Sequence, residues 1–208
     1  MRLDEQRLEQ DLHEACERGN LEQALEWALA AYGPEVMRLM GTVLQDYGRS
    51  REAFGRFQAD LRRELPEFRW QCSFRPWAYR LARNACFQVT RAPPADMRTA
   101  GMPGPPDGPA RRPPTEAPSQ RTSIRERLRA LRESLEPKEL LLLLLRVDQR
   151  LSWREVAWVM FDGNAPPTDE ALDREATALR KQFQHLKAHL RTLGMEEGLI
   201  TASRADAH

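Results

Sequence analysis

The segment from residue 68 to residue 84 holds the side chains best suited to recognising a ligand. It reads Phe-Arg-Trp-Gln-Cys-Ser-Phe-Arg-Pro-Trp-Ala-Tyr-Arg-Leu-Ala-Arg-Asn. Aromatic faces beside guanidinium groups suit unstacked nucleic-acid bases, and arginine side chains suit phosphates. The residue types in this segment therefore indicate a surface for nucleic acid.

A helix is expected from about residue 74 to residue 90, and two stripes of residues run along it. The apolar stripe consists of Trp77, Leu81, Ala85 and Val89. The polar stripe consists of Arg80, Arg83, Asn84, Phe87 and Arg91. Helical spacing aligns the polar stripe with a phosphate backbone. The alternative interpretation is a solvated basic face on a bundle helix, with Trp77 in the core.

A second basic helix is expected from about residue 168 to residue 193. Its apolar residues follow steps of four and three, which is a heptad pattern. The residues expected to face outward are Thr177, Ala178, Lys181, Gln184 and His185, flanked by Arg180, Lys187 and Arg191. A short capped helix at residues 152–161 precedes it, so the pair has the outline of a helix-turn-helix. A helical hairpin, or a seam for a partner helix, fits the same spacing.

The net charge of +1 does not by itself predict nucleic-acid binding, but the distribution of charge does. Residues 66–91 carry five arginines against one glutamate, whereas residues 1–30 carry eight acidic residues against three arginines. The three cysteines, Cys16, Cys72 and Cys86, lack metal-ligand spacing and are expected to be free thiols. No catalytic motif is present. We therefore expect neither an enzyme nor a bound metal or cofactor.

The helical patterns predict an all-α fold with two small helical domains, since no segment alternates as a strand would. Helices are expected over about residues 3–18, 21–46, 50–65 and 74–90 in the first part of the chain. Residues 91–123 hold nine prolines and three glycines, and this composition predicts a flexible linker. Pro137 is expected to open a helix containing the leucine run, and a loop at 162–167 is expected before the last helix.

The order of these pieces resembles regions 2 and 4 of bacterial RNA polymerase sigma factors of the extracytoplasmic-function class. The region 2 resemblance rests on Ala31–Val36, Leu65–Arg69 and Ser73–Asn84. The region 4 resemblance rests on Leu135–Pro137, the leucine run, Leu151–Ala157 and Leu179–Phe183. It implies a region 2-like domain at 30–91, a linker at 92–123 and a region 4-like helix-turn-helix domain at 124–194. An acidic helical extension at 1–29 and a tail at 195–208 lie outside the resemblance.

The resemblance implies an alternative sigma factor that binds core RNA polymerase, recognises two promoter elements and starts transcription. The loop and the helix after it would take a flipped base of the minus-ten element and contact that element. The residues implied are Phe68, Arg69, Trp70, Gln71, Ser73, Trp77, Arg80, Arg83, Asn84 and Gln88. The last helix would enter the major groove at the minus-thirty-five element. The residues assigned there are Arg174, Thr177, Arg180, Lys181, Gln184, His185 and Lys187.

The resemblance also implies partners. The clamp of the largest polymerase subunit would bind a helix carrying Arg51, Phe54, Phe57, Gln58 and Leu61, and the flap of the second subunit would bind the other domain. An anti-sigma factor is a further candidate partner. The location would be cytoplasmic and nucleoid-associated, without membrane insertion, because the longest apolar run, Leu140–Leu145, is too short to span a bilayer.

Two departures from the family pattern alter these expectations. Basic residues at Arg49–Arg56 replace an acidic run on the polymerase-docking helix, and a long segment at 162–178 replaces a tight turn. The last helix is therefore expected to extend about two turns toward its N-terminus. Alternative functions are a helix-turn-helix regulator that acts without polymerase and a helical adaptor between proteins. A further hypothesis is that acidic residues 1–30 fold back on a basic DNA-binding surface.

Overall fold

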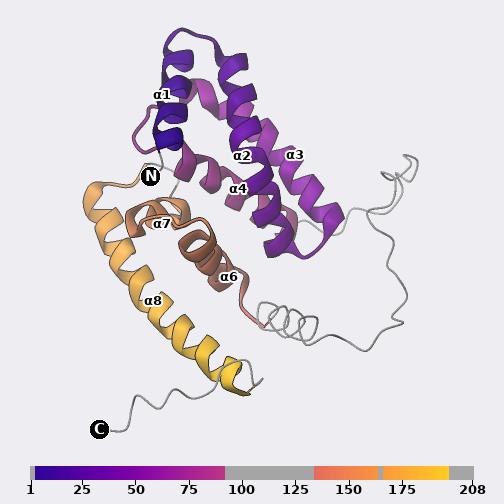
Figure 1. Ribbon diagram of the computed structural model, residues 1–208, viewed down its shortest axis with the longest axis vertical. Helices are drawn as coiled ribbons and strands as arrows, with labels where there is room; N and C mark the ends of the chain where they lie inside the picture. Colours follow the sequence, from indigo (N-terminus) through magenta and orange to yellow (C-terminus); the bar gives the residue numbers. More distant parts are fainter. Residues whose placement is uncertain (1–2, 92–133, 164–165, 197–208) are drawn as a thin grey trace. The chain divides into compact units, whose positions relative to one another are not determined.

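The computed structural model describes residues 3–91, 134–163 and 166–196, and the described residues contain helices and no strand (Figure 1). An all-α fold is thereby confirmed for this part of the chain. The predicted linker at 92–123 and tail at 195–208 lie mainly outside the described residues. No helix among the described residues is long and apolar enough to cross a membrane.

The first helix, α1, spans Leu3–Glu17 and packs along α2, which spans Leu21–Leu44. Leu12 of α1 is fully buried, and Ala15 is nearly so. Gly19 ends α1 in the left-handed region at φ +76°, and the Asn20 N–H donates to the Ala15 carbonyl. Glycine is suited to this position because it has no Cβ to clash there. The acidic N-terminal segment is thus part of the helical core.

Helix α3 spans Tyr47–Glu64 and is followed by a short 3-10 turn, η1, at Leu65–Glu67. Asp46 caps α3 by accepting a hydrogen bond from the Arg49 N–H at 2.6 Å. Helix α4 spans Phe74–Arg91 and packs against both α2 and α3 (Figure 1). Its apolar stripe of Trp77, Leu81, Ala85 and Val89 is buried as predicted.

The later segment contains α6 at Pro137–Leu143, a π-helical turn η2 at Leu144–Asp148, and α7 at Trp153–Met160. The leucines at 140–142, 144 and 145 are buried. Ser152 and Glu155 form the predicted capping box, in which each side chain binds the other residue's backbone N–H. Helix α8 spans Asp169–Glu196, so the predicted extension toward the N-terminus is confirmed.

Residues 1–92 and 137–184 form one compact unit, in which α4 packs against α7. A second unit groups residues 93–136 and 185–208. The predicted domain boundaries divide the chain in another way. The predicted boundary between residues 29 and 30 falls inside α2, and the first unit joins segments that were expected in two separate domains. The physical reason is that α1 and α7 both bury apolar residues in this unit rather than standing apart from it.

Candidate nucleic-acid interface

Four aromatic rings gather where the loop after η1 meets the first turn of α4. Phe68 stacks on Trp77 with ring centroids 4.3 Å apart and an interplanar angle of 18°. Trp70 lies 4.9 Å from Phe68 and 6.2 Å from Phe74. Phe74 and Trp77 are buried, whereas Phe68 and Trp70 are half-buried. We call Phe68, Trp70, Phe74 and Trp77 the aromatic cluster.

Trp70 is held in an unusual backbone conformation, with φ at +54°. A bulky residue rarely adopts this left-handed region, which costs about 1–3 kcal/mol and is often found where a protein binds a ligand. In this conformation the Trp70 ring contacts the Phe68 ring at the edge of the two buried rings, Phe74 and Trp77. The sequence predicted an aromatic loop here, but not the conformation of Trp70.

Helix α1 lies against this cluster through charged and aromatic side chains. Both carboxylate oxygens of Glu9 accept hydrogen bonds from the start of α4, from the Phe74 N–H at 2.7 Å and the Arg75 N–H at 3.1 Å. Glu5 forms an ion pair with the Arg75 guanidinium at 3.3 Å. The His13 ring meets the Trp70 ring edge-on at 4.5 Å. A negative group suits the N-terminus of a helix, where backbone N–H groups are unpaired.

The environment of Glu9 is poorly solvated. Burial raises the pKa of its carboxyl above the usual value, although the hydrogen bonds from Phe74 and Arg75 act in the opposite direction. The Tyr32 hydroxyl is close enough to lower the pKa of Glu9, yet it is buried and has no hydrogen-bond partner of ordinary geometry within the described residues. The Tyr32 hydroxyl therefore lies near the Glu9 carboxylate without forming a hydrogen bond of ordinary geometry to it.

The two arginines of α4 that were predicted to contact phosphates are bound within the protein. Arg83 is only 4% exposed, and its guanidinium donates to the carbonyls of Val159 at 2.9 Å and Phe161 at 3.1 Å. Asp162 forms an ion pair with the same guanidinium. Arg80 donates to the Gly163 carbonyl at 2.5 Å. Both side chains thus bind the C-terminal end of α7 and are unavailable to DNA in this arrangement.

Burial lowers the pKa of the Arg83 guanidinium to about 10, with Arg80 as a further cause, so Arg83 stays charged at neutral pH. The end of a helix carries a partial negative charge on its free carbonyls, which a cation stabilises. Arg83 therefore acts as a cap for α7 supplied by another helix. The sequence pattern placed Arg80 and Arg83 on one stripe of α4, but it did not predict that they bind the end of α7.

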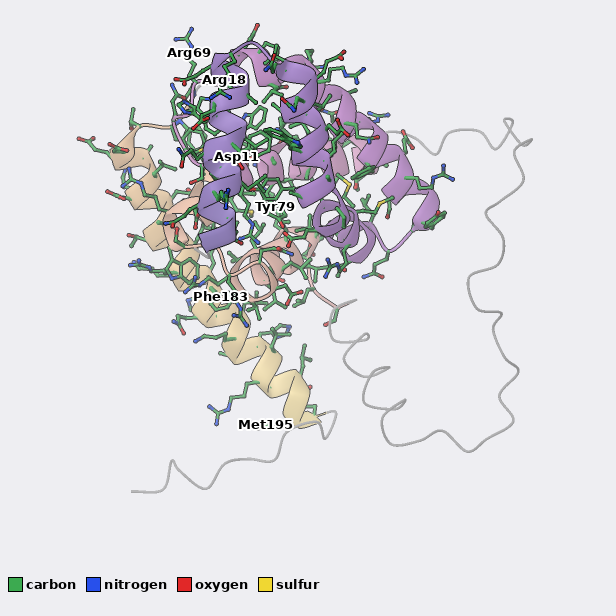
Figure 2. The ribbon with its side chains drawn as sticks, turned by 45° about the horizontal axis from the view of Figure 1, so that its top comes forward. Asp11, Arg18, Arg69, Tyr79, Phe183 and Met195 are labelled. Carbon is green, nitrogen blue, oxygen red and sulfur yellow. The ribbon has the colours of Figure 1, made fainter. Side chains whose placement is uncertain are left out.

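The remaining residues predicted for the minus-ten element differ in exposure. Arg69, Gln71 and Gln88 are exposed, while Ser73 and Asn84 are half-buried. Figure 2 shows Arg69 extending from the surface, in contrast to Tyr79, which lies among the helices. Only the exposed residues and the rim of the aromatic cluster are accessible to a ligand in this arrangement.

The polar face predicted on α8 is accessible. The residues assigned to the minus-thirty-five element are all exposed: Arg174, Thr177, Arg180, Lys181, Gln184, His185 and Lys187. The opposite face is buried at Leu172, Ala176, Leu179 and Phe183. The Phe183 ring meets Trp153 of α7 edge-on at 5.4 Å, and Arg154 of α7 pairs with Asp169 and Asp173 of α8. A row of donors on an exposed helix face is what phosphate contact and groove recognition require.

The residues predicted to bind polymerase divide into two groups. Phe57 and Leu61 are each 1% exposed and belong to the core, so they offer no surface to a partner. Arg51 and Gln58 are exposed, and Phe54 is half-buried. The resemblance implied that Phe57 and Leu61 belong to a docking face, but these two side chains pack inside.

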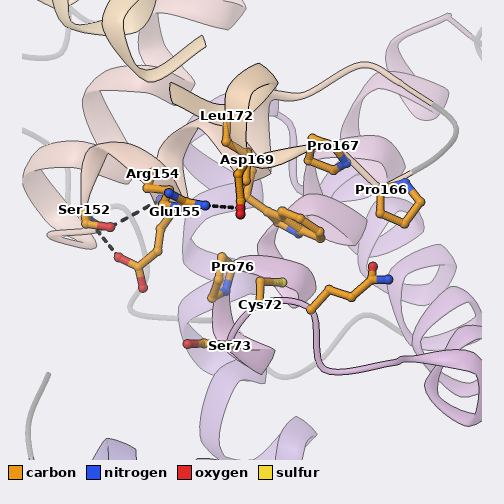
Figure 3. A pocket seen from close by; sticks show the side chains of 12 residues that line it. Cys72, Ser73, Pro76, Ser152, Arg154, Glu155, Pro166, Pro167, Asp169 and Leu172 are labelled. Carbon is orange, nitrogen blue, oxygen red and sulfur yellow. Dashed lines mark hydrogen bonds and ion pairs between the residues drawn. The ribbon is translucent and has the colours of Figure 1, made fainter. Parts of the chain in front are cut away.

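A cavity of about 550 Å³ opens beside residues 71–73, the part of the loop between Trp70 and Phe74 (Figure 3). Its walls come from the start of α4, from α7 and from the first turn of α8. Cys72 lines it, and burial raises the pKa of that thiol to about 12. A protonated thiol is a weak nucleophile, so Cys72 is not activated for nucleophilic chemistry in this cavity.

Sequence reasoning missed a polar network that joins α2, α4 and the residue after η2. Tyr79 Oη lies 2.9 Å from a Glu35 carboxylate oxygen and 2.7 Å from the Gln149 side-chain oxygen. Arg75 Nη2 lies 3.4 Å and 3.2 Å from the same two side chains. The contacts span 40 or more positions along the chain, so no local pattern could have revealed them. From the sequence, Tyr79 and Arg75 could be recognised as part of the aromatic and basic segment at 68–84, but not as members of this network.

The site thus consists of an aromatic cluster covered by α1, the two arginines Arg80 and Arg83 bound at the end of α7, and an exposed polar face on α8. No protein-family model matches the chain, and no curated protein sequence matches it.

Proposed function

We propose that the chain is a sigma-like initiation factor that binds core RNA polymerase and promoter DNA and has no enzymatic activity of its own. The finer organisation in this proposal is a region 2-like module at 30–91 and a region 4-like module at 124–194, joined by a Pro-rich linker. The observation that carries the proposal is the aromatic cluster with Trp70 in a left-handed conformation. A protein that only reads duplex DNA has no need of a surface that stacks on an unpaired base.

The exposed face of α8 supports the second contact with DNA. Helix α8 has 28 residues, and at 1.5 Å per residue it is about 40 Å long, which is ample for a major groove. Lys181 and Gln184 offer donors for base edges, while Arg174 and Arg180 offer charges for phosphates. In this proposal the aromatic cluster would bind an unpaired base and the exposed face of α8 would bind duplex DNA, which are the two contacts expected of a factor that opens a promoter.

The contacts of Arg80 and Arg83 constrain this proposal. If these arginines contact the minus-ten element, then α7 must separate from α4 when the promoter is bound. The arrangement described here would then be the form of the protein before polymerase binding. Binding energy from polymerase would have to exceed the energy of the α4–α7 contact for that change to occur.

The test is run-off transcription with purified core polymerase on a library of promoter fragments. Transcripts that require the chain, and that decrease at least tenfold with Trp70→Ala, would support the proposal; this decrease corresponds to about 1.4 kcal/mol. Gln58→Ala on the exposed face of α3 tests the polymerase contact, since binding to core should weaken while DNA binding stays unchanged. Absence of any chain-dependent transcript, with a well-characterised sigma factor as positive control, would refute the proposal.

A helical adaptor between proteins is the second candidate, and the burial of Arg83 favours it. An arginine used to cap α7 is a structural residue and needs no DNA partner. In that case Trp70→Ala and Lys181→Ala would leave DNA affinity unchanged, and the chain would bind protein partners without nucleic acid. Measuring DNA binding of both variants by fluorescence anisotropy separates the two candidates.

A further inference from the structure

Three parts of α1 occupy the positions that a nucleotide would need at the aromatic cluster. The Glu9 carboxylate accepts from the Phe74 and Arg75 N–H groups, where a phosphate would bind at the start of a helix. The Glu5 carboxylate forms an ion pair with the Arg75 guanidinium, a group that binds phosphate as readily as carboxylate. The His13 ring lies against the Trp70 ring, where a base would meet an aromatic surface.

A buried polar side chain beside the same carboxylate provides a second indication of an anion site. Tyr32 is 5% exposed, and its hydroxyl has no hydrogen-bond partner of ordinary geometry among the described residues. The Tyr32 ring stacks on the Phe74 ring with centroids 5.7 Å apart, which places this side chain at the start of α4, and its hydroxyl is close enough to lower the pKa of Glu9. A buried hydroxyl without a partner is unusual in a native protein. A larger anion with more acceptor oxygens could engage the hydroxyl as well as the backbone N–H groups.

We propose that α1 and single-stranded nucleic acid compete for one site, formed by the aromatic cluster, the backbone N–H groups of Phe74 and Arg75, and the Arg75 side chain. In this arrangement α1 is an internal competitor that keeps the site closed. Its carboxylates stand where phosphates bind and its imidazole stands where a base stacks. The inference rests on the proposed function and adds to it the phosphate contacts at the start of α4 and their control by α1.

The competition has a clear physical basis. The anions of α1 and of a nucleic acid cannot both accept the same two N–H groups, because each group has one hydrogen. Leu12 and Ala15 of α1 are buried, so release of α1 has a cost and the site stays mostly closed. The apparent affinity of a ligand that binds only the open form is reduced by the fraction of molecules that are open. Weakening the α1 contacts should therefore tighten nucleic-acid binding without adding any contact to the ligand.

The experiment uses the full chain and a labelled single-stranded oligonucleotide of about a dozen nucleotides, near the site size of small single-strand binding folds. The test variant is Glu9→Ala with His13→Ala, which removes both acceptor oxygens and the imidazole, and Glu14→Ala is the control because Glu14 pairs with Arg18 away from the cluster. Fluorescence anisotropy should show binding about tenfold tighter in the test variant than in the control. Adding Trp70→Ala to the test variant should remove that gain.

The outcomes distinguish the two proposals. Equal affinity of the test and control variants, with loss of binding on Trp70→Ala, overturns competition by α1 but leaves the aromatic site in place. No effect of Trp70→Ala in any background overturns the proposed site itself. A second measurement needs no variant: amide hydrogen exchange in residues 3–17 should rise when saturating oligonucleotide is added to the wild-type chain. Exchange that stays constant while the oligonucleotide is bound would reject competition by α1.

Discussion

Replacing Arg83 with alanine is the sharpest test of the contact between α4 and α7. The substitution removes a guanidinium that is 4% exposed and donates to the carbonyls of Val159 and Phe161. It also removes the ion pair with Asp162, whose side chain is 68% exposed. The α7 carbonyls would then lose their partners at the end of the helix.

The size of the effect follows from these contacts. A hydrogen bond to a charged group contributes about 1.5–3 kcal/mol, so the two bonds give at most about 6 kcal/mol. Water can reach the carbonyls once the side chain is gone, and the exposed Asp162 contributes little because solvent screens it. We therefore expect Arg83→Ala to lower the free energy of unfolding by about 3 kcal/mol, at the upper end of the usual range for one substitution.

The assay is urea unfolding followed by circular dichroism at equilibrium, with limited proteolysis as a probe of α7. Arg91→Ala on the same helix is the control, because Arg91 is exposed and its loss should change stability by less than about 0.5 kcal/mol. Arg83→Lys should recover part of the loss, since an ammonium keeps the charge but lacks the guanidinium fork. A loss below about 1 kcal/mol for Arg83→Ala would refute the reasoning, because a buried helix cap should cost more.

Two further predictions concern other side chains. Ser152→Ala should destabilise α7 by about 1 kcal/mol through loss of the capping box, measured by urea unfolding, and a change near zero would contradict that role. The Glu9 carboxyl has a raised pKa in the folded state, so the folded chain holds that proton more tightly than the unfolded chain. Its contribution to stability is therefore greatest below the pKa of the unfolded chain, and is lost as the pH rises through the higher pKa of the folded chain. Glu9→Gln should flatten this part of the curve of stability against pH, and an identical slope in wild type and variant would contradict the assignment.

The sequence predicted helices well because their signals are local. Ser152 and Glu155 mark the start of α7, Gly19 marks the end of α1, and Pro137 opens α6. Each signal depends on the backbone groups of one or two turns, so it can be interpreted without knowledge of the rest of the fold. The lengthened α8 was also predictable, since its apolar repeat begins at Leu172, well before the segment that resembles a recognition helix.

The partners of the candidate site were less predictable. Burial of Phe57 and Leu61 distinguishes a core face from a docking face, and apolar spacing on α3 is the same in both cases. Arg83 likewise looks the same in sequence whether it faces phosphates or caps α7. Its partners lie at positions 159 and 161, beyond a long segment of chain. Only tertiary packing decides between such alternatives.

The contact between α4 and α7 has a consequence for how the chain behaves when cut. The two helices belong to one compact unit, yet residues 93–136 separate its parts along the sequence. While the chain is intact, the tether keeps the local concentration of each part high near the other. A single cleavage within residues 93–136 would make the association depend on protein concentration. The two fragments should then stay together in concentrated solution and part on dilution.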